Sequence, residues 1–515
     1  MVGSAPAGTI GNIYDLFRSR FPADLSRPFL ETEDGGVFTY GDLHTLVGRY
    51  ARLLTDLGLQ KGDRVAVQVD KSPETIVLYL ATVRAGGVYL PLNSAYTPAE
   101  VDYFLSDATP RVFVCRPGTE STLQPIADKA GVGTLLTLGT RGDGTLPQRA
   151  ADLDPDFATV AVDDDDMAAI LYTSGTTGRS KGAMMSHRNL GSNALTLHQY
   201  WGFRPGDVLL HALPVFHTHG LFVATNCVLL NGSSMIFLPK FDADQVLSLL
   251  PRATVMMGVP TFYTRLLAHP GLTRESTAHM RLFISGSAPL LADTHKEFSA
   301  RTGHAILERY GMTETGMLTS NPLDGDRIPG TVGFPLPEVD LRVVGEQGNT
   351  LGTDDVGVIE VKGPNVFSGY WQMPEKTKQE IKPDGFFITG DVGKVDARGY
   401  VHIVGRAKDL IISGGYNVYP KEVETVIDAI DGVVESAVVG VPHPDFGEGV
   451  VAIVLRRPGA AAPDEAGVIA ICKQQLANYK MPKRVFFVDE LPRNTMGKVQ
   501  KNLLRDQHSG LFTGK

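Results

Sequence analysis

The chain has 515 residues, of which 43% are hydrophobic and 20% are charged, and its formal net charge is −9. These values are typical of a globular protein with more than one domain, because a single hydrophobic core rarely organises so many residues. The negative charge argues against a general nucleic-acid-binding protein, and it means that an anionic substrate must be held by local Lys and Arg side chains.

The N-terminal residues and the cysteines indicate the compartment. The segment 1–17 lacks the basic start and the apolar core of a secretory signal, and no later segment has the length and apolarity of a transmembrane helix. Cys115, Cys227 and Cys472 are odd in number and far apart, so we expect neither structural disulfides nor a cysteine metal site. The sequence therefore predicts a cytoplasmic protein without a membrane anchor.

The first 160 residues alternate helical and extended patterns. Apolar side chains recur at helical spacing in two segments, 39–54 and 74–84. Short apolar runs at 64–69, 86–92 and 111–115 are expected to be strands. Strands separated by helices predict βαβ units and a largely parallel sheet.

A loop rich in hydroxyls and glycines follows the next predicted strand, 168–172. It contains Thr173, Ser174, Gly175, Thr176, Thr177, Gly178 and Lys181. Glycines let backbone N–H groups approach an oxyanion, hydroxyls donate further hydrogen bonds, and the lysine adds charge. The spacing differs from that of a Walker A motif. We interpret the loop as a phosphate cradle; the alternative is a flexible polar surface loop.

The rest of the chain falls into three patterns. A second series of βαβ-like segments runs from 167 to about 323, with expected strands at 208–211, 234–238, 253–258 and 282–285. From about residue 330, short runs at 340–344, 357–362 and 399–404 are typical of a small antiparallel β unit or distorted barrel. After residue 409 a separate block begins, with a helix from Pro420 and strands at 436–440 and 451–455. These patterns predict several subdomains in sequence.

Five motifs occur in a fixed order along the chain. They are the hydroxyl-rich loop, Glu308 to Glu314, Thr389-Gly-Asp391, Gly405 to Asp409 and Pro492 to Lys498. This set resembles the motifs of the adenylate-forming superfamily, which includes acyl-CoA synthetases, adenylation domains of peptide synthetases and firefly-type luciferases. The resemblance covers essentially the whole chain. It implies an α/β fold, with two doubly wound sheet subdomains and a small β-barrel-like unit in residues 1–407, and a small mobile α+β domain in 408–515.

The resemblance also implies the reaction. A substrate carboxylate attacks the α-phosphate of ATP and pyrophosphate leaves, so Mg²⁺, cations and backbone donors must stabilise the phosphoryl oxygens. Coenzyme A then accepts the acyl group. ATP is expected on the loop 173–181 and on Gly286, Ser287, Ala288, Glu308, Arg309, Tyr310, Gly311, Met312, Thr313, Asp391, Arg406 and Lys498.

Within that set the resemblance implies particular roles. Thr173 and Glu314 are expected to hold Mg²⁺, and Thr313 to contact the α-phosphate. Asp391 is expected to bind the ribose hydroxyls, and Tyr310 to stack on adenine. Each has a simpler structural alternative: a helix-start cap for Thr313 and Glu314, and a turn former for Asp391.

The C-terminal block is expected to serve both half-reactions. By resemblance, Lys498 bridges the attacking carboxylate and the α-phosphate, and with His217, Thr313 and Glu314 it forms the catalytic set. The structural alternative for Lys498 is a solvated surface lysine. Lys408 matches the hinge about which the small domain rotates, and Gly414, Gly415 and Tyr416 match the loop that lines the pantetheine tunnel.

The local sequences at 211–222, 280–290 and 308–315 most resemble those of the malonyl-CoA synthetase family. The acid is therefore expected to contact His217, His219, Met257, Arg281 and Ser285. By resemblance His217 gates the thiol tunnel, and the alternative is a buried structural histidine. A second carboxylate needs a cation, because burying it unpaired is costly. Arg281 is the expected clamp, a scaffold role for it is the alternative, and Arg309 is the second candidate.

Three other functions fit the same motifs. They are a ligase for methylmalonate or a short monocarboxylic acid, an enzyme that loads an acyl or peptidyl carrier protein, and a luciferase-like oxygenase. The low aromatic content, 8%, gives no sign of an extended aromatic pocket and disfavours the last. We therefore expect a ligase that converts malonate, ATP and coenzyme A into malonyl-CoA, AMP and pyrophosphate.

Overall fold

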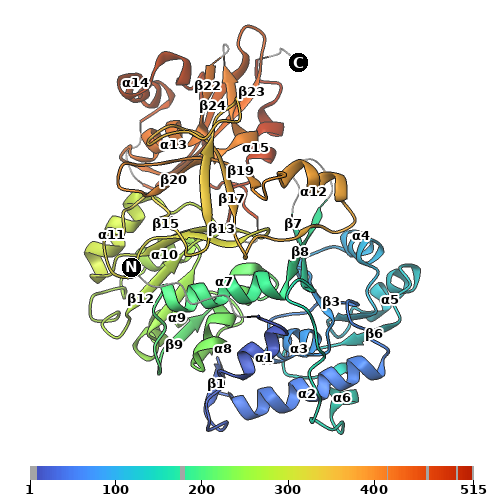
Figure 1. The fold of residues 1–515 in the computed structure, drawn as a ribbon. Helices are drawn as coiled ribbons and strands as arrows, with labels where there is room; N and C mark the ends of the chain where they lie inside the picture. Colours follow the sequence, from blue (N-terminus) through green and yellow to red (C-terminus); the bar gives the residue numbers. More distant parts are fainter. Residues whose placement is uncertain (1–8, 174–179, 414–415, 460–462, 495–496, 513–515) are drawn as a thin grey trace.

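The structure is a computed structural model that describes residues 9–173, 180–413, 416–459, 463–494 and 497–512. Two large sheets make up most of the first part of the chain, a four-stranded sheet follows, and a five-stranded sheet lies in the C-terminal part (Figure 1). This arrangement confirms the predicted α/β fold with a larger N-terminal and a smaller C-terminal part. No helix among the described residues has both the length and the apolarity needed to cross a membrane.

The first large sheet has seven strands in the order β18-β8-β7-β4-β3-β5-β6. Strands β3 to β7 are paired in parallel, as the alternation of helices and strands predicts. Its strands are β3 (Arg64–Gln68), β4 (Val88–Pro91), β5 (Val112–Cys115), β6 (Thr134–Thr137), β7 (Met167–Thr173), β8 (Lys181–Ser186) and β18 (Gly369–Tyr370). The preceding helices are α1 (Ile13–Arg18), α2 (Tyr40–Asp56), α3 (Pro73–Arg84), α4 (Pro98–Ala108), α5 (Glu120–Lys129) and α6 (Thr145–Ala150).

The second large sheet has nine strands in the order β15-β14-β13-β12-β11-β9-β10-β1-β2. Its strands are β1 (Pro28–Thr32), β2 (Val37–Thr39), β9 (Val208–His211), β10 (Ser234–Phe237), β11 (Val255–Gly258), β12 (Leu282–Ser285), β13 (Leu307–Met312), β14 (Gly316–Ser320) and β15 (Phe334–Pro335). Its helices are α7 (His187–Tyr200), α8 (Asn226–Asn231), α9 (Ala243–Leu249), α10 (Pro260–Ala268) and α11 (Ala292–Thr302), with a π-helix at His219–Thr225.

The hydrophobic core explains how the two sheets are held together. Its largest cluster joins side chains of both sheets through helices α3, α7 and α8, so these helices are sandwiched between the sheets. Helices α9 to α11 cover the outer face of the nine-stranded sheet, and α4 and α5 cover that of the seven-stranded sheet. The carboxyl ends of parallel strands in such sheets are where ligands bind in doubly wound folds.

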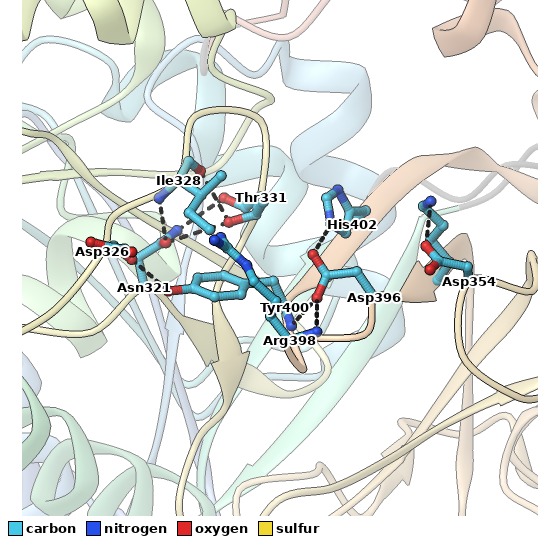
Figure 2. Close-up of polar contacts among 10 residues, drawn as sticks. Asn321, Asp326, Ile328, Thr331, Asp354, Asp396, Arg398, Tyr400 and His402 are labelled. Carbon is cyan, nitrogen blue, oxygen red and sulfur yellow. Dashed lines mark hydrogen bonds and ion pairs between the residues drawn. The ribbon is translucent and has the colours of Figure 1, made fainter.

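The predicted β unit is an antiparallel sheet in the order β16-β17-β19-β20. Its strands are β16 (Asp340–Val344), β17 (Gly357–Lys362), β19 (Phe387–Val395) and β20 (Val401–Arg406). Figure 2 shows how the β19–β20 turn is fixed: Asp396 accepts hydrogen bonds from the backbone N–H groups of Arg398 and Tyr400 and lies 3.0 Å from His402 Nε2. The Tyr400 hydroxyl donates to the Asp326 carbonyl, which ties this turn to the loop after β14.

The C-terminal part has its own hydrophobic clusters on both faces of a five-stranded sheet. The sheet contains β21 (Ile411–Ser413), β22 (Tyr416–Val418), β23 (Val433–His443), β24 (Gly447–Arg456) and β25 (Arg484–Val488), and the helices are α13 (Pro420–Asp428), α14 (Glu465–Gln475) and α15 (Lys501–His508). Pro420 occupies the first turn of α13, where its missing N–H costs nothing. The boundary between 407 and 408 falls at the 3₁₀ turn Ala407–Asp409; its role as a domain boundary stays a prediction.

Candidate active site

Three neighbouring parallel strands of the nine-stranded sheet bring the predicted acid and adenine segments together. Gly258 at the end of β11 lies opposite Ser285 at the end of β12, and Ser285 lies opposite Glu308 in β13. Met257 precedes Gly258 and is buried. The backbone after β12 turns sharply, with Ser287 at φ 72°, a strained conformation for a residue with a side chain, and such strain clusters at functional sites.

Arg309 extends into this region from β13. It is 3% exposed, and its Nε and Nη2 atoms have no hydrogen-bond partner among the described residues. A Cβ added to Gly286 would lie 2.3 Å from the Arg309 Cζ atom, so the absent side chain of Gly286 makes room for the guanidinium. Burial lowers the pKa of Arg309 to about 9. A buried cation with free N–H groups is prepared to receive an anion.

Two histidines lie near the Arg309 guanidinium: His217, just before the π-helix, and His219, its first residue. Burial, together with the Arg309 charge, lowers the pKa of His217 to about 4 and that of His219 well below its ordinary range, so both rings are neutral near pH 7. The Nδ1 atom of His219 lies 3.2 Å from Ser287 Oγ, while its Nε2 atom has no partner among the described residues. Ser285 Oγ is also without one there. The predicted acid site is thus a cluster of unpaired polar groups around one cation.

Arg281 does not belong to this cluster. It precedes the first residue of β12, whereas Ser285 ends the strand, which places the two roughly 13 Å apart along the strand. The guanidinium forms an ion pair with buried Asp207, with Nε 2.8 Å from Oδ1. Burial alone would raise the Asp207 pKa, but hydrogen bonds from Arg281, the Arg204 backbone and Thr254 lower it overall. The ion pair with Asp207 favours the alternative, scaffold role for Arg281 over the predicted clamp role, and the role of Arg281 stays a prediction.

Replacing Arg281 by Ala should destabilise the protein by about 3–5 kcal/mol, because it leaves the Asp207 carboxylate buried without its partner. The preference for malonate over propionate should not change. Thermal unfolding and initial rates with both acids measure the two effects. The double variant Arg281→Ala/Asp207→Ala should lose less stability than the single one, and a selective loss of malonate use in Arg281→Ala would contradict the assignment.

The predicted phosphate loop connects antiparallel strands β7 and β8, in which Thr173 lies opposite Lys181. Ser174, Gly175, Thr176, Thr177 and Gly178 lie outside the described residues. Lys181 is half-buried at the start of β8, and its Nζ lies 3.2 Å from Glu380 Oε1. The loop therefore opens from a strand pair at the carboxyl end of β7, as a phosphate cradle requires.

Thr313 and Glu314 lie in the turn between β13 and β14, not at the start of a helix, so the capping alternative does not apply. Gly311 allows this tight hairpin, because a Cβ there would lie 2.1 Å from the Gly316 carbonyl oxygen. Glu314 is buried, and burial raises its pKa. Met312 is the last residue of β13. The hairpin presents one carboxylate beside the nucleotide segments.

Asp391 and Arg406 lie opposite each other in β19 and β20 and form an ion pair with Nε 2.7 Å from Oδ1. The Tyr310 hydroxyl donates to the other Asp391 oxygen, so β13 and β19 meet at this carboxylate. Burial raises the pKa of Glu308, two residues before Tyr310, to about 8, and its Oε1 accepts a hydrogen bond from the Leu290 backbone N–H. Two of the predicted nucleotide residues, Tyr310 and Arg406, therefore contact the buried carboxylate of Asp391. Ala288 is half-buried beside Ser287.

Lys498 lies in the turn 494–498, where its backbone N–H donates to Asn494 Oδ1. A Cβ on Gly497 would lie 3.1 Å from Thr261 Oγ1 at the start of α10, so the C-terminal turn approaches the N-terminal domain. Desolvation by the surrounding protein and the positive charge of Arg406 lower the pKa of Lys498 to about 8. The Lys498 side chain is exposed to solvent, and the charges of Arg406 and Asp391 lie near enough to act on its pKa.

The remaining predicted residues follow β20 in the sequence. Lys408 is exposed in the 3₁₀ turn Ala407–Asp409. Tyr416 is 59% exposed and stacks on Tyr479 of the same domain. Gly414 and Gly415 lie outside the described residues. The hinge and pantetheine roles of these residues stay predictions.

Sequence reasoning missed two residues that contact the site. The Tyr370 hydroxyl lies 3.1 Å from Glu314 Oε1, and Glu380 pairs with Lys181. Both belong to a segment that no motif covers, and their partners are 56 and 199 residues away in the sequence. No local spacing could have identified them.

Comparison with known proteins agrees with this geometry and with the resemblance to adenylate-forming enzymes. Residues 20–371 match the family model of the AMP-binding enzyme, and residues 422–498 match the AMP-binding enzyme C-terminal domain. Feruloyl-CoA synthase of Amycolatopsis sp is 37% identical over 92% of this chain and 94% of its own length, and malonate–CoA ligase of Arabidopsis thaliana is 34% identical over 96% and 89%. The crystal structure of ATP-bound MatB from Rhodopseudomonas palustris matches with a TM-score of 0.95 and 62% identity over 97% of this chain and 99% of that chain. The chain therefore belongs to the AMP-binding enzyme family.

Proposed function

We propose that the protein is an AMP-forming malonate–CoA ligase. The observation that carries the proposal is the buried guanidinium of Arg309, with two nitrogen atoms unpaired among the described residues. A monocarboxylic acid uses its only carboxylate to attack phosphorus, which would leave this cation buried without a counter-ion. A dicarboxylic acid supplies the counter-ion with its second carboxylate.

The groups around Arg309 suit the second carboxylate of malonate, which a single carbon atom separates from the reacting carboxylate. His219 is neutral, and if Ser287 donates to its Nδ1 atom, its Nε2–H remains as a donor. Ser285 Oγ offers another hydroxyl. One cation and two neutral donors match one carboxylate, so no second positive charge is needed. One of the relatives named above, a malonate–CoA ligase, supports the same substrate.

The arrangement around Asp391 supports ATP as the activating nucleotide. Asp391 accepts hydrogen bonds well and can hold two ribose hydroxyls, Tyr310 lies beside it, and Arg406 balances its charge. Lys498 reaches the same place from the C-terminal domain. A point charge on a flexible stem can contact both the attacking carboxylate and the α-phosphate while the adenylate forms. Thr313, in the hairpin turn, would contact the α-phosphate.

Mg²⁺ fits the oxygen donors of the site. Glu314 offers a buried carboxylate and Thr173 a hydroxyl, and hard oxygen ligands are those that Mg²⁺ prefers. When bound, the ion would neutralise charge on the phosphate oxygens. Lys181 adds a cation on the same side.

Coenzyme A is proposed as the acyl acceptor. For this step the C-terminal domain would turn about Lys408, so that Tyr416 and its neighbours replace Lys498 at the site. His217 would lie beside the path of the thiol. The exposed position of Tyr416 is consistent with a face that becomes covered only in the second half-reaction. The cytoplasmic location stays a prediction from the sequence.

Replacing Lys408 by Pro should separate the two half-reactions. Proline fixes φ near −65° and removes the backbone N–H, so a hinge that must change its backbone conformation is held in one state. The arrangement described here has Lys498 beside Asp391, so adenylate formation should persist while thioester formation fails. Isotope exchange between pyrophosphate and ATP measures the first and acyl-CoA formation from isolated adenylate the second. A variant that forms acyl-CoA normally would rule out this hinge.

The pKa of Lys498 predicts a pH dependence. The ammonium form stabilises negative oxygens, and its pKa of about 8 lies below the ordinary lysine value. The rate of adenylate formation at low substrate should therefore fall as the pH rises through about 8, while thioester formation from ready-made adenylate should not follow that curve. Rates of both half-reactions from pH 6.5 to 9.5 are the measurement. The same decline in the rates of both half-reactions would show that a group other than Lys498 causes the decline.

Pyrophosphate release with malonate, with and without coenzyme A, tests the proposed function. We expect release with malonate to exceed release with propionate, and malonyl-CoA to appear only with coenzyme A. Methylmalonate is the main substrate alternative, because one extra methyl group changes binding by only about 1–3 kcal/mol. Activity only with an added carrier protein would favour the carrier-loading alternative, and release with propionate alone would contradict a dicarboxylate site.

A further inference from the structure

Two side chains join the phosphate-loop lysine to the expected metal ligand. Tyr370 ends β18 and Glu380 ends helix α12 (Pro374–Glu380). The Tyr370 hydroxyl lies 3.1 Å from Glu314 Oε1 and 2.6 Å from Glu380 Oε2. The other oxygen of Glu380 lies 3.2 Å from the Nζ atom of Lys181. The four residues form a continuous polar chain from Glu314 to Lys181.

The surroundings hold this chain firmly. Tyr370 is 3% exposed, and its ring packs edge-on against Phe367, with centroids 4.8 Å apart. The backbone N–H of Phe367 donates to the Glu314 carbonyl. The Lys181 ammonium lies 4.2 Å from the centroid of the Tyr370 ring, and a cation over an aromatic face is attracted to it. Buried networks of this kind keep their members in one geometry.

The backbone of the same segment is anchored to the phosphate strand. Strand β18 pairs with β8, the strand that begins at Lys181, and Tyr370 lies opposite Ala183. The Tyr370 N–H donates to the hydroxyl of Thr377 in α12 at 2.9 Å. These hydrogen bonds therefore join helix α12, strand β18 and the start of β8 to one another.

The distribution of hydrogen bonds leaves Glu314 available. A tyrosine hydroxyl carries one proton, and its shorter contact is with Glu380. Glu380 is further balanced by Lys376, 2.8 Å away, and by Lys181. Among the described residues, the Glu314 carboxylate has the longer Tyr370 contact and a hydrogen bond from its own backbone N–H, so it is oriented but keeps lone pairs for a metal ion. Partners of this kind orient metal ligands without contacting the metal.

We propose that Tyr370 and Glu380 are positioning residues for adenylate formation, which fix Glu314 and Lys181 at a constant separation so that Mg²⁺ and the phosphates of ATP bind as one unit. The inference rests on the proposed function, since it uses the roles given there to Glu314 and Lys181. It adds that the metal side and the lysine side of the phosphate site are coupled through the β18–α12 segment.

The test compares ATP binding with and without Mg²⁺ by isothermal titration calorimetry. Tyr370→Phe removes the hydroxyl but keeps the ring over Lys181, and Glu380→Gln removes the charge but keeps the shape. Each should reduce the enhancement of ATP affinity by Mg²⁺ by about 3- to 10-fold, the effect of losing one typical intramolecular hydrogen bond, because these residues act on the ligands only indirectly. The matched control is Glu375→Gln on the same helix, where an exposed pair with Lys378 at 3.0 Å is lost; it should behave as the unmodified protein does.

The double variant and the half-reactions distinguish positioning from general damage. Because both residues act through one chain of contacts, Tyr370→Phe/Glu380→Gln should reduce the Mg²⁺ enhancement little more than the stronger single variant does. Adenylate formation should slow while thioester formation from ready-made adenylate stays unchanged. Unaltered Mg²⁺ enhancement in both single variants, or additive effects, would overturn the inference. Absence of Mg²⁺-enhanced ATP binding in the unmodified protein would instead contradict the proposed function.

Discussion

Replacing Lys498 by Ala should reduce adenylate formation by about 10²- to 10³-fold, the loss typical when one transition-state donor is removed. Thioester formation from ready-made malonyl-adenylate should change little. The reason is that Lys498 lies near enough to Asp391 and Arg406 for their charges to act on it, and only the first half-reaction joins a carboxylate to phosphorus. Pyrophosphate release and acyl-CoA formation, measured separately, test this expectation.

The control for Lys498→Ala is Lys501→Ala, three residues later. Lys501 belongs to α15 and its ammonium pairs with Glu424 inside the C-terminal domain, 2.5 Å away. Its loss should affect thermal stability more than the first half-reaction. Equal losses of both half-reactions in Lys498→Ala would show that the lysine supports the fold or the hinge and does not act in adenylation.

Replacing Arg309 by Ala should weaken the use of malonate by about 10- to 100-fold in kcat/KM, because a charge-assisted hydrogen bond is worth roughly 1.5–3 kcal/mol. Propionate has no second carboxylate and should lose little or even gain. The melting temperature of the free protein should not fall, since the variant removes a buried cation whose Nε and Nη2 atoms have no hydrogen-bond partner among the described residues. Initial rates with both acids and thermal unfolding give the three readouts.

Arg309→Lys sharpens the experiment. Lysine keeps the positive charge but lacks the planar guanidinium that binds a carboxylate through two hydrogen bonds. We therefore expect Arg309→Lys to recover only part of the malonate activity. Sulfoacetate carries a tetrahedral sulfonate in place of the second carboxylate. Rates with it therefore distinguish the effect of the negative charge from the effect of the shape of the anion. A rise in the KM for ATP with unchanged malonate preference would move Arg309 to the nucleotide site and remove the main physical support for malonate.

The sequence alone determined most of the architecture. Apolar runs of strand length predicted β3, β4, β5 and β9 to β12, and their alternation with helices predicted the parallel pairing. These features can be predicted because the pattern of apolar residues within one segment reports its secondary structure and its burial. The ordered motifs predicted which loops carry chemistry, and the structure places Asp391, Arg406, Tyr310 and Lys498 near one another.

The tertiary structure decided which arginine is the candidate clamp and what orients Glu314. Arg281 precedes β12 and Arg309 lies within β13. The sequence does not show that Arg281 pairs with Asp207 while the Arg309 guanidinium packs against Gly286, just beyond the opposite end of β12. Tyr370 and Glu380 carry no local signal, because their function comes from partners far away in the chain. Patterns within a segment report burial and secondary structure, whereas the pairing of charged side chains is set by which strand ends the fold brings together.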